Sequence, residues 1–153
     1  MNKVLLTLLF IPLVNFSQTY DDLTSINSSE NFIKVMTKNG WKKRTQQFKL
    51  DKRDMIYYGL NFSGEGKNLK SEAEAGYHTK YNFFTLSYFF VNNTQKNNFN
   101  RIFNSIKKKC KYVGIYGPDT GFNAVEYKCK RYSFVISEGD NEGVIMQRYA
   151  GKN

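Results

Sequence analysis

Much of the fold is decided by the stretch Phe99-Asn100-Arg101-Ile102-Phe103-Asn104-Ser105-Ile106-Lys107-Lys108-Lys109-Cys110. Its apolar residues recur at positions i, i+3, i+4, i+7 and i+11, and this spacing places them along one side of a helix. A helix with one apolar side must pack against another element. The short apolar segments that follow, up to residue 146, predict strands. We therefore expect this part of the chain to form a helix lying on antiparallel strands.

A similar succession of elements is predicted earlier in the chain. Residues 27–30 (Asn-Ser-Ser-Glu) resemble a helix start with a capping residue, and Gly40 is suited to end that helix. Phe32, Val35 and Met36 would form its apolar side. Strands are expected at 41–50, 55–62 and 81–91, either element at 69–78, and an extended lead-in at 19–26.

These elements predict an α+β fold in which two helices pack on an antiparallel sheet. A shift of 67 residues places Phe32 on Phe99 and Val35 on Ile102. Residue identity between the two segments is almost nil, so only the pattern of elements repeats. We interpret residues 18–153 as a single domain of two pseudo-duplicated halves, each a helix followed by a β-meander, at about 27–91 and 92–150.

The first 17 residues have the features of a secretory signal peptide. Lys3 supplies a positive charge, and Val4–Val14 is an apolar run. A membrane-spanning helix needs roughly 20 apolar residues, so this run is too short to span a bilayer. Cleavage is predicted between Ser17 and Gln18. The protein is therefore expected to be exported, either to a periplasm or out of the cell, without a transmembrane anchor.

The two cysteines, Cys110 and Cys129, are predicted to form a disulfide. Cysteines in exported proteins usually pair. The Gly117–Gly121 segment (Gly-Pro-Asp-Thr-Gly) is a turn signal between two predicted strands. A hairpin folded about this turn brings Cys110 opposite position 128 or 129. Cross-strand neighbours have Cα atoms about 4.5–5.5 Å apart, which is within the range of a disulfide.

The sequence offers little for catalysis. His78 is the only histidine, which argues against a histidine-based zinc site or a serine–histidine–aspartate triad. We predict no catalytic residue, metal ligand or cofactor. A hydrolase built on two carboxylates remains an alternative. Glu126 is the acid expected in the middle of a strand, and its alternation with Lys128 favours an ion pair over a catalytic role.

Aromatic residues on the second face of the predicted sheet suggest a binding function. Tyr57, Tyr77, Tyr81 and Phe83 are the candidate interface residues, since aromatic side chains are favoured in the cores of protein interfaces. We therefore expect a small exported, non-enzymatic protein that binds another protein, in the manner of an inhibitor, an immunity protein or an assembly factor. The positive charge of the chain admits an acidic partner.

The net charge of +10 at pH 7 suggests an alternative, an electrostatic site for a polyanion such as nucleic acid, anionic lipid or glycan. The candidate anion-binding residues are Lys42, Lys43, Arg44, Lys107, Lys108 and Lys109. Arginine, the residue best suited to bidentate phosphate binding, is scarce compared with lysine. A general lysine and asparagine excess explains the charge as well as a dedicated anion site does.

Overall fold

The computed structural model describes residues 18–44, 54–61, 71–117 and 123–149. Its elements, in chain order, are α1 (Tyr20–Ser25), α2 (Ser29–Lys38), β1 (Lys42–Lys43), β2 (Met55–Leu60), β3 (Ala73–His78), β4 (Phe83–Phe89), α3 (Asn93–Lys109), β5 (Lys111–Tyr116), β6 (Ala124–Lys128), β7 (Tyr132–Glu138) and β8 (Glu142–Tyr149). The strands form one antiparallel sheet in the order β1-β2-β3-β4-β8-β7-β6-β5. The expected α+β class with an antiparallel sheet is thus confirmed.

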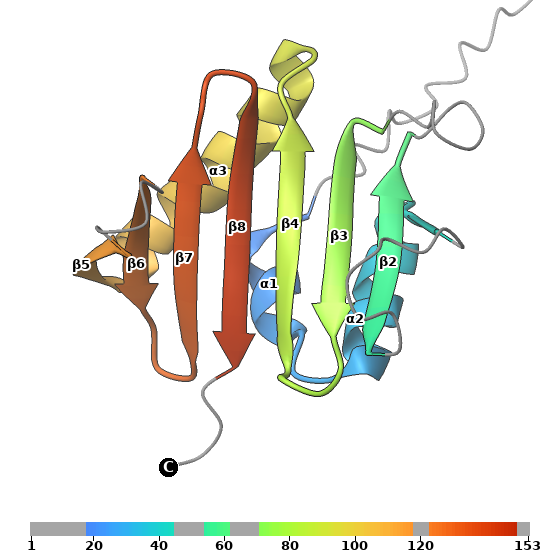
Figure 1. Ribbon diagram of the computed structural model, residues 1–153, viewed down its shortest axis with the longest axis horizontal. Coiled ribbons are helices and arrows are strands. Elements are labelled where there is room, and N and C mark those ends of the chain that lie inside the picture. Colours follow the sequence, from blue (N-terminus) through green and yellow to red (C-terminus); the bar gives the residue numbers. More distant parts are fainter. Residues whose placement is uncertain (1–17, 45–53, 62–70, 118–122, 150–153) are drawn as a thin grey trace, which may run out of the picture.

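The described helices all lie on the same face of this sheet, behind it in Figure 1. Strand alternation explains how the sheet meets them. Phe84, Leu86 and Tyr88 of β4 are at most 1% exposed because they point toward the helices. Thr85 and Ser87, which alternate with them, are half-buried on the opposite face. The core therefore lies between the helices and one side of the sheet.

Helix α3 follows the periodicity of its sequence. Phe99, Ile102 and Ile106 are fully buried on its sheet side. The Asn92 side chain caps the helix by accepting a hydrogen bond from the backbone N–H of Gln95 at 3.2 Å. Three lysines in the last turn complement the partial negative charge of the helix C-terminus.

Strand β8 contacts two of the helices through a glycine and a buried glutamine. A Cβ atom built on Gly143 would lie 2.5 Å from ring carbons of Phe99, so only glycine lets α3 approach β8 this closely. Gln147 Nε2 donates hydrogen bonds to the carbonyl oxygens of Leu23 (3.1 Å) and Ile26 (3.4 Å). These bonds hold the C-terminal end of α1 against the centre of the sheet.

The expected extended lead-in at 19–26 is wrong, because Tyr20–Ser25 form helix α1. A capping box begins this helix. Thr19 Oγ1 accepts a hydrogen bond from the backbone N–H of Asp22, whose carboxylate accepts one from the backbone N–H of Thr19. Leu23 is fully buried and anchors the short helix to the core. The described residues therefore form one helix more than the two predicted.

The predicted segments 69–78 and 41–50 both contain a strand in their described parts. Residues 73–78 form strand β3. The alternating pattern of alanine and glutamate therefore predicted the structure better than the helix propensity of these residues did. The strand expected at 41–50 is represented by β1, which is two lysines long. Residues 45–50 lie outside the described part of the chain, as does the predicted signal peptide.

The predicted disulfide between Cys110 and Cys129 is confirmed. Their Cα atoms are 4.6 Å apart, at the junction of α3 with β5 and at the end of β6. Lys111 and Lys128, the next residues inward, are directly opposite each other in the register of the hairpin. The bridge thus fixes the end of α3 to the β5–β6 hairpin, as the position of the turn predicted.

Candidate functional site

The candidate site is the open face, defined as the side of the sheet opposite the helices. No described helix or strand covers it (Figure 1). The register lines up one row of side chains across five strands, from Tyr57 past Gly76 and Thr85 to Met146 and Val135. The larger apolar or aromatic residues that strand alternation places on this face, all half-buried, are Met55, Tyr57, His78, Phe83, Phe89, Val135, Val144 and Met146.

Aromatic rings gather at the β3–β4 turn end of the open face. The His78 ring stacks on the Phe83 ring at a centroid distance of 5.3 Å, and it lies 4.6 Å from the Tyr81 ring. Tyr81 is 61% exposed, and the Nζ atom of Lys80 lies 5.4 Å from its ring centroid. The cluster presents aromatic surface next to a positive charge, as protein interfaces commonly do.

Tyr57 and Met55 extend this surface across β3. A Cβ atom on Gly76 would lie 3.1 Å from Met55 Cε and 3.2 Å from Tyr57 Cε1, so both side chains lie directly over the glycine. Partial burial raises the pKa of the Tyr57 hydroxyl above its ordinary value, and the hydroxyl is neutral at physiological pH with or without this rise. The surface that Met55 and Tyr57 form over Gly76 is therefore apolar, with the neutral Tyr57 hydroxyl as its polar group.

Tyr77 is separated from the other three predicted interface residues. It is 3% exposed and lies on the helix-covered face, where its ring packs 5.2 Å from that of Phe32. Its hydroxyl donates a hydrogen bond to Asn82 Oδ1. Tyr77 belongs to the core, whereas Tyr57, Tyr81 and Phe83 belong to the open face.

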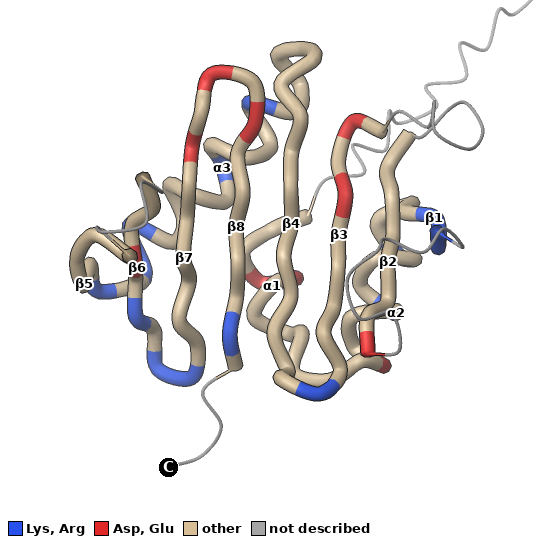
Figure 2. The backbone as a smooth tube through the Cα atoms, viewed as in Figure 1, with Lys and Arg blue, Asp and Glu red and all other residues tan. Residues whose placement is uncertain are grey.

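The predicted anion-binding residues are divided between the two ends of the sheet. Lys42, Lys43 and Arg44 belong to β1 and its continuation, whereas Lys107–Lys109 end α3 beside β5, at the opposite edge (Figure 2). The Arg44 side chain is 6% exposed, and its guanidinium binds the carboxylate of Glu74. The structure therefore does not bring these residues together into one basic site.

Two of the three lysines at the end of α3 have contacts within the chain. Lys107 Nζ lies 4.4 Å from the ring centroid of Phe103. Lys109 Nζ lies 4.3 Å from that of Tyr20 and 3.1 Å from a carboxylate oxygen of Asp21. Both side chains remain largely at the surface, so these contacts leave their charge accessible to solvent.

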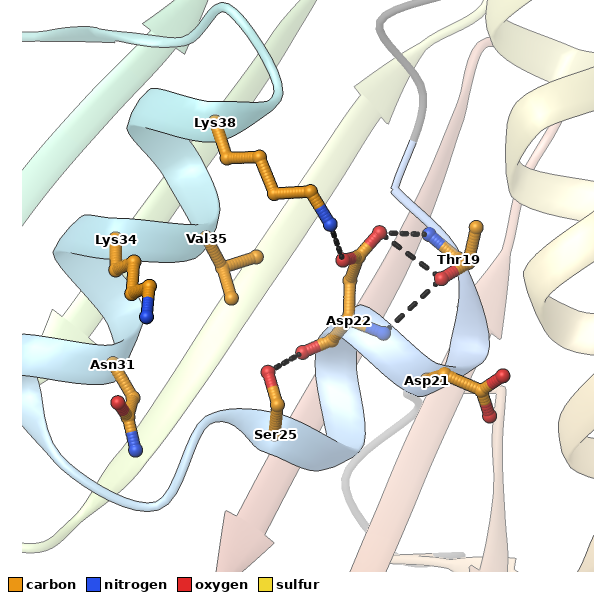
Figure 3. A pocket seen from close by; sticks show the side chains of 8 residues that line it. All are labelled: Thr19, Asp21, Asp22, Ser25, Asn31, Lys34, Val35 and Lys38. Atoms are coloured by element: carbon orange, nitrogen blue, oxygen red, sulfur yellow. Dashed lines mark hydrogen bonds and ion pairs between the residues drawn. The ribbon is translucent and has the colours of Figure 1, made fainter.

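A pocket of about 470 Å³ lies between α1 and α2 (Figure 3). Its lining includes two neighbouring acids, Asp21 and Asp22, so it is the candidate position for the carboxylate pair of a hydrolase. The two side chains diverge: Asp22 faces Thr19 and Lys38, while Asp21 points away from them and binds Lys109. The acids do not converge on a common point.

The ionisation of Asp22 also argues against a role as a general acid. Burial opposes its charge, but hydrogen bonds from Thr19 and the nearby Lys38 ammonium outweigh burial and lower its pKa. A carboxylic acid that donates a proton near neutral pH needs a raised pKa instead. Asp22 is best explained as the cap of α1. Glu126 of β6 borders a hollow of only about 20 Å³.

Among the described residues, no group of three or more histidine, cysteine, aspartate or glutamate side chains is placed to hold a metal ion. None of the helices in that part of the chain is long and apolar enough to cross a membrane. Comparisons of the chain with known protein families, with curated proteins and with solved structures found no match.

Proposed function

We propose that this protein is an exported, non-enzymatic binding module that holds a partner protein against the open face of its sheet. The observation that carries the proposal is the one-sided architecture. Helices cover one face, while the other presents Tyr57, Phe83 and the exposed Tyr81 with no described element over them. Large contiguous apolar surface outside the core is typical of interaction sites.

The chemistry of the open face fits a protein partner better than a small substrate. Its rings are arranged across a broad sheet surface, and the hollow that Tyr116, Val135 and Met146 line on this face is only about 20 Å³, roughly the size of one water molecule. Substrate sites are usually enclosed pockets of several hundred Å³. A broad aromatic surface with polar tips instead resembles the core of a protein interface.

Export is part of the proposal and has two supports. Residues 1–17 combine a positive charge with a short apolar run, as signal peptides do. The Cys110–Cys129 disulfide is typical of proteins that fold in an oxidising compartment. Both features are compatible with a periplasmic or a secreted location.

We also propose that the domain consists of two related halves. In each, a helix is followed by four strands: α2 precedes β1–β4, and α3 precedes β5–β8. The two groups meet at the β4–β8 pair, so each half contributes its last strand to the centre of the sheet. Buried Phe32 and Phe99 occupy equivalent places at the 67-residue shift.

The test uses two open-face variants and one control in the full disulfide-bonded protein. Tyr81→Ser and Phe83→Ser should retain the circular dichroism spectrum and the cooperative unfolding of the wild type. In a pull-down from the cell envelope or culture medium of its own host, the wild type should retain a partner protein, and both variants should fail to retain it. Ile33→Ser removes a matched exposed apolar residue, 37% exposed on the helix layer, and should retain the partner.

Loss of folding in Phe83→Ser and Tyr81→Ser would mean that these side chains serve the core, and it would refute the proposal. Equal loss of the partner in Ile33→Ser would also refute it, since the binding surface would then include the helix layer.

A further inference from the structure

The two edges of the sheet differ in a way that points to a second site. β1 ends the sheet with only Lys42 and Lys43, and exposed lysines on a short strand are a common protection against unwanted strand pairing. β5 ends it with the six residues Lys111–Tyr116. On its inner side β5 pairs with β6, and no described strand lies on the outer side of β5.

Strand β5 exposes apolar side chains on both of its faces. Tyr112 is 52%, Val113 55%, Ile115 64% and Tyr116 43% exposed. They account for four of the seven large hydrophobic residues that are exposed in the described ranges. An edge strand with unpaired backbone groups and exposed apolar side chains is a template for an additional strand.

Positive charge surrounds this edge. Lys111 of β5 and Lys128 of β6 are directly opposite each other and both exposed, although like charges in this position repel (Figure 2). One acid, Glu126, lies on the same strand two residues from Lys128. Further exposed cations adjoin the pair in sequence: Lys107 and Lys108 at the end of α3, and Lys130 and Arg131 after β6.

The positive charge near β5 favours one kind of partner strand over another. A second copy of the chain, which is itself strongly positive, would add like charge at this edge. The irregularity in β5–β6 pairing between Tyr112 and Gly114 also bends the strand, and a bent edge hinders pairing of two rigid copies. A flexible segment can follow the bend, and acidic side chains on it would offset the repulsion between Lys111 and Lys128.

We propose that β5 binds an extended acidic segment of a partner protein as an additional strand of the sheet. The backbone of β5 supplies hydrogen bonds, Tyr112, Ile115 and Tyr116 supply apolar contacts, and Lys111 with Lys128 selects acidic side chains. The site is independent of the open-face cluster of Tyr57, Tyr81 and Phe83, which lies over β2–β4.

The proposal is tested by fluorescence anisotropy with the full disulfide-bonded protein at about 50 mM salt, where screening is weak. The probe is a labelled peptide of alternating glutamate and valine. It should bind at least about tenfold more tightly than its lysine–valine counterpart. Methylation of alternate backbone nitrogens, which removes donors without changing charge, should weaken binding by about tenfold.

Matched variants assign the binding to β5. Lys111→Glu and Ile115→Ser should each weaken the glutamate–valine peptide by about tenfold. Lys42→Glu changes a lysine on the opposite edge strand, and Ile33→Ser changes an exposed isoleucine on α2; both should bind as the wild type does. Tyr81→Ser and Phe83→Ser should also bind normally, which separates this proposal from the one about the open face.

Four results would overturn the proposal. They are no binding of the acidic peptide, binding insensitive to backbone methylation, equal weakening by Lys42→Glu, and dimerisation of the wild type that Ile115→Ser abolishes. The second result, together with equally tight binding of single-stranded oligothymidylate, would assign the basic residues to a polyanion surface. The last would make a second copy the occupant of the edge.

Discussion

The hydroxyl oxygen of Tyr20 lies 3.6 Å from Sγ of Cys129, and 3.7 Å from Sγ of its disulfide partner Cys110. Helix α1 therefore rests on the bridge that joins α3 to the β5–β6 hairpin. Burial raises the pKa of Tyr20, although Lys109 next to its ring opposes the rise. Three elements that are distant in sequence are thus held together at one point of the fold.

Removing this bridge should destabilise the domain substantially. The cysteines are 19 residues apart, and closing a loop of that size stabilises a fold by about 3 kcal/mol in the chain-entropy model. Urea unfolding of the Cys110→Ser/Cys129→Ser variant should show a loss of this size relative to the oxidised wild type. Reductant should destabilise only the wild type. Alkylation of both thiols in the native, unreduced protein would contradict the prediction.

The contact between Gly143 and Phe99 predicts a steric effect. Gly143→Ala adds a methyl group where ring carbons are 2.5 Å away, so we expect a loss of about 1–3 kcal/mol from overpacking. The same change should cost less in a Phe99→Leu background, where the ring is absent. Gly139→Ala, whose nearest neighbour would be 3.7 Å away, is the matched control. Additive losses in the double variant would contradict this account.

Asp22 should make stability depend on pH in the acidic range. Its pKa is lower in the folded protein than the value of about 3.9 in an unfolded chain, so the unfolded state binds the proton more readily. Its contribution is therefore complete above that value and is lost as pH falls through the folded pKa. Urea unfolding of wild type and Asp22→Asn should differ most near pH 6 and converge toward pH 2.

The neighbouring acid provides the control for this pH effect. Asp21 has a side chain that is 82% exposed and takes no part in the capping box. Asp21→Asn should therefore reduce the free energy of unfolding at pH 6 by less than Asp22→Asn does. A constant difference between wild type and Asp22→Asn from pH 6 to pH 2 would refute the prediction.

The ion pair of Arg44 with Glu74 should be important for stability, because the Arg44 side chain is only 6% exposed. Glu74→Gln removes the negative partner of a buried guanidinium, and we expect a loss of about 1–3 kcal/mol in urea unfolding. Ser71 also donates a hydrogen bond to the Glu74 carboxylate, at 2.8 Å. Glu142→Gln, an exposed acid of β8, should change stability by less than about 0.5 kcal/mol.

Parts of the fold with a strong local signal were predictable from the sequence. The spacing of Phe99, Ile102 and Ile106 predicted α3, and the position of the turn predicted the disulfide. Helix α1 was missed because six residues are too short to show a periodic apolar side. The spacing of Thr19 and Asp22, typical of a capping box, was the available signal.

The order of the strands could not be predicted from the sequence, because the β4–β8 pair joins residues about sixty positions apart, such as Leu86 and Ile145. Nothing local encodes that pairing. The assignment of Tyr77 to the open face failed for a related reason. Its neighbours Ala73 and Ala75 are small and do not reveal which face of β3 is buried. Val135 was missed because it stands between two serines on the open face of β7, and Met146 was missed because apolar residues occur on both faces of β8.

The central position of β8 has a consequence for the order of events during synthesis. Synthesis proceeds from the N-terminus, yet β8, the last of the described strands, pairs with both β4 and β7. Until residues 142–149 emerge, β4 and β7 each lack a neighbour, and the two halves of the sheet share no strand pair. The sheet cannot close before β8 has been made, and a stop codon before β8 would leave β1–β4 and β5–β7 with no strand pair between them.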